Sequence, residues 1–196
     1  QMMRHICVAI AHSQGARSIQ IAQLIDTDVF AKAFCNFNIA RLAKQNPSKL
    51  LEQYWSRLSH MRFRGKVRSM VKCAQIFEDI QGEHGSFAQL IKHHQIPQRI
   101  RTEKEFDRFW AGFDSLQHEM ISRKMPFFRS MTSLLQLLLD LDFDSVKPDL
   151  IVMRLARRIG LTSKETGDRK MREVVQIIQR YCLNRPLRAS AVDLMM

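Results

Sequence analysis

The stretch MPFFRSMTSLLQLLLDLDFDSVKPDLIVMRLARRIG, residues 125–160, decides the fold class of this chain. Apolar residues recur at three- and four-residue intervals on both sides of the polar turn at 142–145, which indicates two helices joined by a turn. We expect these helices at 134–141 and 150–159, because Gly160 supplies a stop signal for the second. The stretch therefore predicts a helix–turn–helix unit.

Asp149 lies where the second of these helices begins. Pro148 suits an early helical position, because its φ is already helical and it needs no N–H partner there. Asp149 then falls in the first turn, where the positive end of the helix dipole keeps a carboxylate ionised and fixed. By position alone the simpler interpretation is that Asp149 only stabilises the helix N-terminus, and a catalytic role is the alternative.

Helical periodicity extends over most of the chain. Only seven glycines and five prolines interrupt the 196 residues, and no stretch alternates apolar and polar residues over the length of a strand. Long helices are expected at 65–81, at 106–116 after a polar loop at 92–102, and from Thr162 or Ser163 to Tyr181. We predict an all-α protein of about ten helices, in one globular domain or in two small lobes that share a core.

The charge of the chain indicates a polyanionic partner. Lys and Arg number 31 against 19 Asp and Glu, a net charge of +12, which suits nucleic acid, with a generically basic soluble protein as an equally weighted alternative. The apolar content of 45% supports a sizeable core and excludes bulk disorder. Charges interrupt every apolar run, so we expect no membrane span and no secretory signal. Four widely spaced cysteines are typical of reduced thiols in a cytosolic protein, and because the chain begins at Gln1 we expect its true start to be missing.

Basic residues gather in three clusters. They stand at a loop-to-helix junction (Arg62, Arg64, Lys66, Arg68, Lys72), around the polar loop (Arg99, Arg101, Lys104, Arg108) and toward the C-terminus (Arg154, Arg157, Arg158, Lys164, Arg169, Lys170, Arg172). At the first, Gly65 and the helix N-terminus favour a phosphate, and a solvated helix start is the alternative. Three clusters suit a surface that straddles a duplex backbone.

The spacing of His, Cys, Gly and Ser excludes several common sites. The sequence contains no HxxxH, HxxE or CxxC spacing and no phosphate-binding glycine loop, and no nucleophile elbow surrounds Ser13. We therefore expect neither a metal nor a cofactor.

Two segments, Met125-Pro-Phe-Phe-Arg-Ser-Met-Thr-Ser and Lys-Pro-Asp149-Leu-Ile-Val-Met-Arg154…Arg158-Ile-Gly160-Leu, resemble the active-site region of helix-hairpin-helix DNA glycosylases. In that superfamily a hairpin contacts the DNA backbone and the following segment carries the catalytic aspartate. The resemblance implies that Asp149 is catalytic, that Arg129 and Arg154 contact phosphates, and that residues 1–196 form one all-α domain of two lobes with a cleft. Phe127 and Phe128 stand where the hairpin usually has glycines. Because Phe resists a positive φ, we expect an altered hairpin geometry.

Two further segments, FAKAFCNFN at 30–38 and MRFRGKV at 61–67, resemble bacterial 3-methyladenine DNA glycosylase I. This resemblance implies a cytoplasmic bacterial protein that acts on duplex DNA at the nucleoid. It implies DNA contacts by the basic residues of the junction (Arg62, Arg64, Lys66) and a base pocket near His12 and Gln20. The zinc-binding Cys and His residues of that family are not recognisable here.

The implied activity is DNA repair by base excision. The enzyme would rotate a damaged, alkylated purine into an aromatic-lined pocket and hydrolyse its N-glycosidic bond, with Asp149 stabilising charge on the sugar or orienting water. Met131 stands where bifunctional members carry a lysine nucleophile, which implies a monofunctional enzyme. Trp110, Phe127 and Phe128 are candidates for stacking or wedging, with the core as the alternative for Trp110. Two other hypotheses stay open: a DNA-binding relative that has lost catalysis, and an all-α interaction protein.

Overall fold

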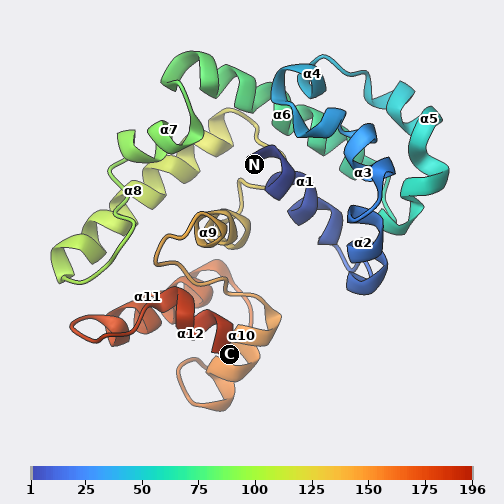
Figure 1. Ribbon diagram of the computed structural model, residues 1–196. Helices are drawn as coiled ribbons and strands as arrows, with labels where there is room; N and C mark the ends of the chain where they lie inside the picture. Colours follow the sequence, from blue (N-terminus) through green and yellow to red (C-terminus); the bar gives the residue numbers. More distant parts are fainter. Residues whose placement is uncertain (1, 196) are drawn as a thin grey trace. The chain divides into compact units, whose positions relative to one another are not determined.

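The computed structural model describes residues 2–195, which form α-helices and two 3-10 turns without a β-strand among them (Figure 1). The all-α prediction is confirmed. The first six helices are α1 (Met2–His12), α2 (Ser18–Ile25), α3 (Asp28–Ala33), α4 (Ile39–Ala43), α5 (Pro47–Leu58) and α6 (Gly65–His84), with 3-10 turns at Cys35–Phe37 and Ser59–Met61. The others are α7 (Phe87–His93), α8 (Glu103–Ser122), α9 (Met131–Asp140), α10 (Leu150–Arg158), α11 (Asp168–Cys182) and α12 (Ala189–Met195).

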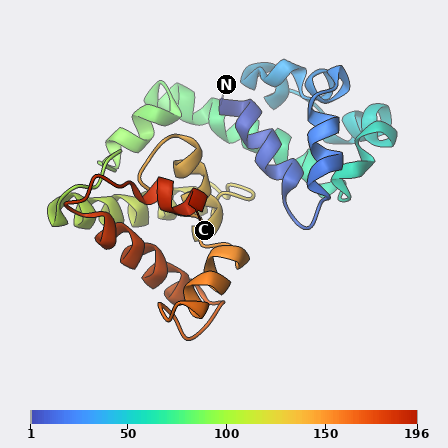
Figure 2. The same cartoon turned by 60° about the horizontal axis from the view of Figure 1, so that its bottom comes forward.

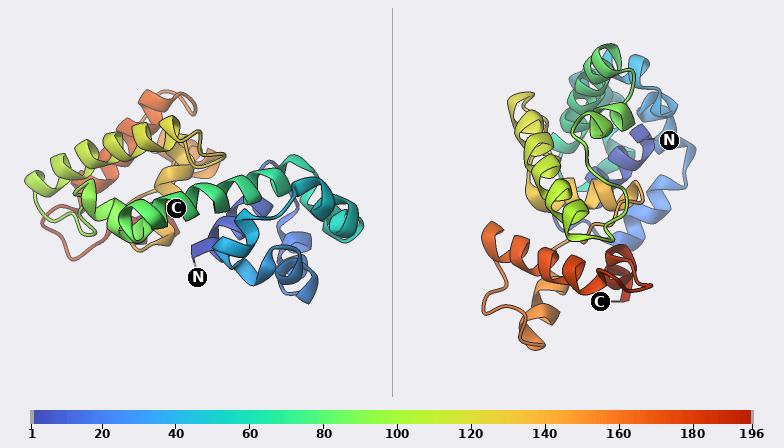
Figure 3. Two further views of the ribbon diagram at one scale, coloured as in Figure 1. Left: turned by 90° about the horizontal axis from the view of Figure 1, so that it is seen from above. Right: turned by 90° about the vertical axis from the view of Figure 1, so that its left-hand side faces the viewer.

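The helices group into two compact units (Figures 2 and 3). The first unit contains Gln1–Gln89 and Met125–Phe127, and the second contains Leu90–Lys124 and Phe128–Met196. The single domain with a cleft between two lobes stays a prediction, so each unit is described by itself.

The core of the first unit is organised by α6. The apolar positions that predicted this helix are all buried (Val67, Met70, Val71, Ala74, Phe77, Ile80), and α1 and α4 pack against it. The helix continues through Gly82 and ends at Gly85, whose φ of 78° is left-handed. A glycine adopts this left-handed conformation without a steric penalty from a Cβ atom. The helix therefore ends at Gly85 and not at Gly82.

The second unit is built around α8, which begins with a capping box. The Thr102 hydroxyl accepts a hydrogen bond from the Glu105 N–H at 3.2 Å, and the Glu105 carboxylate accepts one from the Thr102 N–H at 3.1 Å. Trp110 lies in the core, 4% exposed, and its indole N–H donates to the side-chain oxygen of Gln179 on α11 at 2.8 Å. The hydrogen bond joins α8 to α11 through two buried polar groups that would otherwise be unsatisfied.

The expected start of the last long helix at Thr162 or Ser163 is wrong. The Thr162 hydroxyl donates to the Lys164 carbonyl and accepts from the Lys164 N–H, at 3.0 and 3.3 Å, so it closes a local turn. Helix α11 begins later, at Asp168, after Gly167 with a φ of 100°.

The four cysteines carry free thiols (Cys7, Cys35, Cys73, Cys182). Burial raises the pKa of the Cys7 thiol, so this group stays protonated at neutral pH. Within residues 2–195, no helix has both the length and the apolar character to cross a membrane.

Two helical glycines provide a matched test of packing. A Cβ built at Gly112 on α8 would lie 2.4 Å from the His94 carbonyl oxygen, whereas one built at Gly82 on α6 meets nothing within 4 Å. We expect Gly112→Ala to lower the free energy of unfolding by about 1–3 kcal/mol through overpacking. Gly82→Ala should raise it by about 0.5–1 kcal/mol, because alanine favours a helix interior. Urea unfolding of both variants measures the difference, and two effects of the same sign would contradict this packing.

Candidate functional site

Asp149 is the N-cap of α10. Its Oδ1 accepts hydrogen bonds from the N–H groups of Ile151 and Val152 at 2.9 and 3.1 Å, and its Oδ2 lies 3.6 Å from the Lys147 ammonium. Asp149 therefore lies one residue before the helix, not in its first turn as expected. The helix N-terminus holds the carboxylate in place, yet the side chain remains 34% exposed.

The surface around Asp149 combines apolar and basic side chains. Leu150 and Ile151, which follow Asp149 directly, are 51% and 66% exposed and place two adjacent large aliphatic side chains at the surface. Arg154 follows one turn later on α10 with an exposed side chain, and its Nε lies 3.6 Å from Glu165. The carboxylate of Asp149 is therefore fixed at an exposed surface, where it can act on a polyanion that basic residues such as Arg154 bind.

The hairpin before α9 has the left-handed conformation that its sequence was expected to resist. Phe127 has a φ of 71°, so this phenylalanine takes a conformation that glycine adopts without strain, at a cost of about 1 kcal/mol or more. Phe128 is completely buried, whereas Phe127 is half-buried. Of the three candidates for stacking or wedging, Trp110 and Phe128 are buried, and Phe127 alone keeps part of its side chain exposed. Arg129 is exposed, and its carbonyl accepts from Gln117 at 3.2 Å.

The basic junction before α6 serves the fold as well as the surface. Lys66, expected to contact phosphate, is instead buried, and its ammonium donates to the carbonyls of Ala11 and Ser13 at 2.9 and 2.7 Å. Arg62, with a φ of 70°, donates to the Gly15 carbonyl at 2.6 Å. These two cations hold the loop that follows α1. Burial, and secondarily the charge of Arg62, lowers the pKa of Lys66.

Arg64 is one of the residues of this junction that stay exposed. Its side chain is exposed, and its guanidinium carbon lies 5.6 Å from the centre of the Trp55 ring. An arginine that stacks on an aromatic ring is held in position while its N–H groups face solvent.

The two expected base-pocket residues lie in different surroundings of the first unit. His12 ends α1, and burial, followed by the nearby charge of Lys66, lowers its pKa, so the imidazole is neutral at pH 7. Gln20 on α2 lines a cavity of about 340 Å³ that Arg57 and His60 also line. The lining of that cavity does not include His12.

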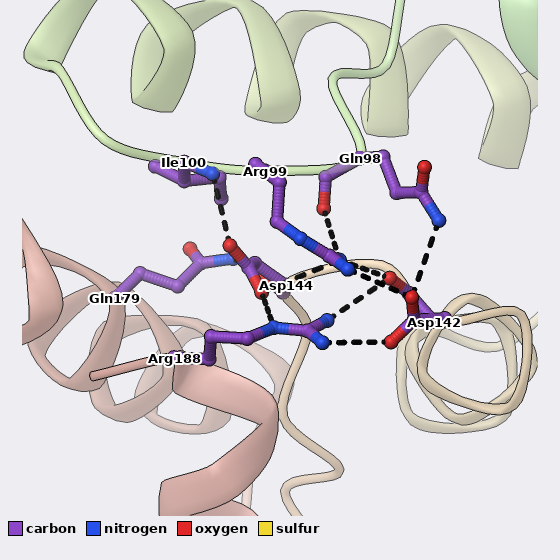
Figure 4. Close-up of polar contacts among 7 residues, drawn as sticks. All are labelled: Gln98, Arg99, Ile100, Asp142, Asp144, Gln179 and Arg188. Atoms are coloured by element: carbon purple, nitrogen blue, oxygen red, sulfur yellow. Dashed lines mark hydrogen bonds and ion pairs between the residues drawn. The ribbon is translucent and has the colours of Figure 1, made fainter. Parts of the chain in front are cut away.

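Sequence reasoning missed an ion-pair network in the second unit (Figure 4). Asp142 accepts from Arg99 and from Arg188, each at 2.8 Å. Asp144 accepts from Arg188 Nε at 2.8 Å and from the main-chain N–H of Ile100 at 3.0 Å. The network joins three segments more than 40 residues apart in sequence, a separation at which local patterns give no signal.

Much of the third basic cluster is also paired. Arg172 forms two hydrogen bonds of 2.7 Å with the Asp114 carboxylate and lies over the Trp110 ring. Lys170 donates to Glu173 at 2.6 Å. These ion pairs lie within the second unit. Fewer basic side chains of the third cluster are therefore free to bind DNA than the sequence predicts.

A serine, a histidine and a carboxylate line up in the second unit but lack the groups that hydrolysis needs. His94 lies 2.9 Å from the Ser115 hydroxyl and 2.7 Å from Glu119, and Glu119 also accepts from Arg123 at 2.8 Å. Ser115 lies inside α8, where main-chain N–H groups bond to carbonyls of the preceding turn and cannot stabilise an oxyanion. The arrangement ties the segment after α7 to α8.

The described residues do not fit a metal site. Across positions 2–195, no group of three or more His, Cys, Asp or Glu side chains is arranged to hold an ion. The zinc site of the resembling family therefore has no counterpart among these residues, and we derive no chemistry from a metal.

The burial of Lys66 provides a test of its structural role. Lys66→Met keeps the aliphatic stem but leaves two carbonyls without a charged donor, so we expect the free energy of unfolding to fall by about 2 kcal/mol. Lys72→Met, an exposed position on the same helix, should change it by less than about 0.5 kcal/mol. Chemical denaturation followed by circular dichroism measures both. Equal midpoints for the two variants would show that the ammonium does not hold the loop.

Comparison with known proteins identifies the family. Residues 13–132 match the family described as methyladenine glycosylase, which is more than half of the chain and includes the junction before α6 and the hairpin before α9. No curated protein and no solved structure matches the chain. The match and the all-α fold agree, and the chain belongs to the methyladenine glycosylase family, whose members are DNA repair glycosylases.

Proposed function

We propose that this protein is a monofunctional DNA glycosylase that hydrolyses the N-glycosidic bond of an alkylated purine, with Asp149 as the catalytic carboxylate. One observation carries the proposal: the helix N-terminus fixes Asp149 through two N–H groups while a third of the side chain stays exposed. The family match ends at residue 132, so the role of Asp149 is argued from this geometry and from the resemblance of its segment.

The chemistry requires a negative charge that is already in position. When the bond between C1′ and the base nitrogen breaks, its electron pair leaves with the base and positive charge develops on the sugar. An alkylated purine is partly activated as a leaving group, so modest assistance suffices. The Asp149 carboxylate would stabilise the sugar cation without reorganising, because the two N–H groups of α10 already orient it.

Water is the nucleophile in this proposal. A water molecule adds to C1′, and its proton passes to Asp149 or to solvent as the C1′ hydroxyl forms. Met131, the first residue of α9, has a thioether where bifunctional enzymes have an amine. A thioether cannot form a Schiff base with the sugar, so the strand would remain uncut after base release.

Binding of the duplex would rest on the exposed arginines. Neither Arg64 nor Arg129 forms an ion pair with a carboxylate of the described residues, and both are exposed. Phe127, half-buried in the hairpin, is the side chain we propose to fill the gap in the stack when the target base rotates out.

Asp149→Asn separates chemistry from capping. Asparagine keeps an oxygen that can accept from Ile151 and Val152 but removes the charge, so base release from alkylated duplex DNA should fall by about 100-fold or more. Single-turnover release of methylated purine measures the rate. Thr102→Ala, which removes the cap of α8 in the same unit, controls for lost stability and should keep the wild-type rate.

Two outcomes would count against the proposal. Wild-type protein that binds the duplex but releases no base would favour a DNA-binding relative without catalysis. An Asp149→Asn variant as active as wild type would show that Asp149 only caps α10.

Salt dependence tests the role of Arg64. If Arg64 contacts one phosphate, Arg64→Gln should reduce the slope of log affinity for duplex DNA against log salt by about 0.9. Arg172→Gln is the matched control, because Arg172 is paired with Asp114 and should leave the slope unchanged. Fluorescence anisotropy at several salt concentrations measures both slopes, and equal slopes for Arg64→Gln and wild type would exclude the contact.

A further inference from the structure

A cavity in the second unit is lined by an unusual concentration of arginines. It has a volume of about 480 Å³ and lies between the polar loop before α8 and the segment that follows α11. Four arginines line it (Arg99, Arg101, Arg185, Arg188), and Pro186 and Leu187 contribute apolar wall. Apolar walls exclude water, which strengthens the field of the charges that line a cavity.

Two of the four guanidinium groups are fixed in advance. Arg99 and Arg188 both direct their guanidinium groups at Asp142, as Figure 4 shows, with contacts of 2.8 Å from each. Arg188 also donates to Asp144, which is 4% exposed. Such pairing uses only some of the five N–H groups of each arginine, so the remaining ones can donate to a ligand without a rearrangement.

The carboxylates in this network do not oppose an anion. Both oxygens of Asp144 are engaged, one by Arg188 and the other by the main-chain N–H of Ile100 at 3.0 Å. Asp142 pairs with both Arg99 and Arg188 and is not among the residues that line the cavity. Asp144 does line the cavity, but both of its oxygens already accept hydrogen bonds, and its charge orients Arg188.

The other two arginines leave a surplus of positive charge. Among the described residues, no carboxylate forms an ion pair with the guanidinium of Arg101 or Arg185, although the Glu105 carboxylate accepts from the main-chain N–H of Arg101 at 2.8 Å. The guanidinium of Arg185 lies 4.3 Å from the centre of the Tyr181 ring and donates to the Tyr181 carbonyl, so its position is also defined. The four arginines carry four positive charges, and Asp142 and Asp144 carry two negative charges. This group of six residues therefore has a net charge of +2.

We propose that this cavity binds a phosphate monoester. A monoester is a dianion at neutral pH, which matches the surplus of two charges, and its oxygens accept the paired N–H groups of arginine. The cavity exceeds the size of a phosphate group, so it can also take the attached sugar. A free nucleoside monophosphate and the terminal phosphate of a nicked DNA strand share this chemistry. The site does not depend on the proposed glycosylase activity.

The test uses the full chain and three single variants. We expect inorganic phosphate to bind wild type in isothermal titration at constant ionic strength, and Arg101→Gln and Arg185→Gln each to weaken it by about tenfold, the effect of one charged hydrogen bond. Arg158→Gln removes an exposed arginine of the same unit outside the cavity and should bind as wild type does. Circular dichroism verifies that each variant is folded.

Two further ligands identify the source of the phosphate. A deoxynucleoside 5′-monophosphate is compared with its nucleoside, and nicked duplex with a 5′-phosphate is compared with the same duplex ending in a 5′-hydroxyl. Tighter binding of the phosphorylated member of either pair by wild type, lost in Arg185→Gln, supports the site. The pair that shows this preference identifies the ligand. Equal binding by wild type and the two cavity variants, or an equal loss in Arg158→Gln, overturns the proposal.

Discussion

A charge removed from water must find partners within its own unit, and this requirement shapes both halves of the molecule. In the first unit the buried ammonium of Lys66 draws the carbonyls of Ala11 and Ser13 around it and thereby sets the course of the loop after α1. In the second, the buried carboxylate of Asp144 gathers the main chain at Ile100 and the side chain of Arg188. Asp144 lies five residues before Asp149 in sequence. The contacts of Asp144 with Ile100 and Arg188 therefore anchor the segment that positions the candidate catalytic carboxylate.

The same requirement divides the net charge of +12 between structure and function. Lys66, Arg99, Arg172 and Arg188 are engaged by carbonyls or carboxylates of their own unit. Arg64 and Arg129 stay exposed, and Arg64 is supported by an aromatic ring. The four engaged charges are not available to a polyanion, whereas Arg64 and Arg129, placed on the surface, remain available. For recognition of a backbone, such placement matters more than the total charge.

Asp149 shows how one carboxylate can serve the fold and still be proposed for chemistry. Its Oδ1 satisfies two N–H groups that have no partner within the helix, and this orients the whole carboxylate. Phe127 shows a comparable compromise, because the hairpin keeps a left-handed residue although no glycine is present. Met125 and Phe128, which flank this turn, are completely buried, and such packing is what holds a strained residue in place.

The sequence by itself determined the all-α class, the long helices α6 and α8, and the helix start at Asp149. These follow from short-range periodicity and from capping residues, which act within one or two turns. Tertiary structure alone decided that Lys66 is internal, that His12 and Gln20 face different surroundings, and that Arg188 reaches Asp142 and Asp144. An arginine looks the same in sequence whether it faces solvent or a carboxylate 46 residues away. Which of the two holds depends on how the helices pack, and packing is set by contacts that no local pattern records.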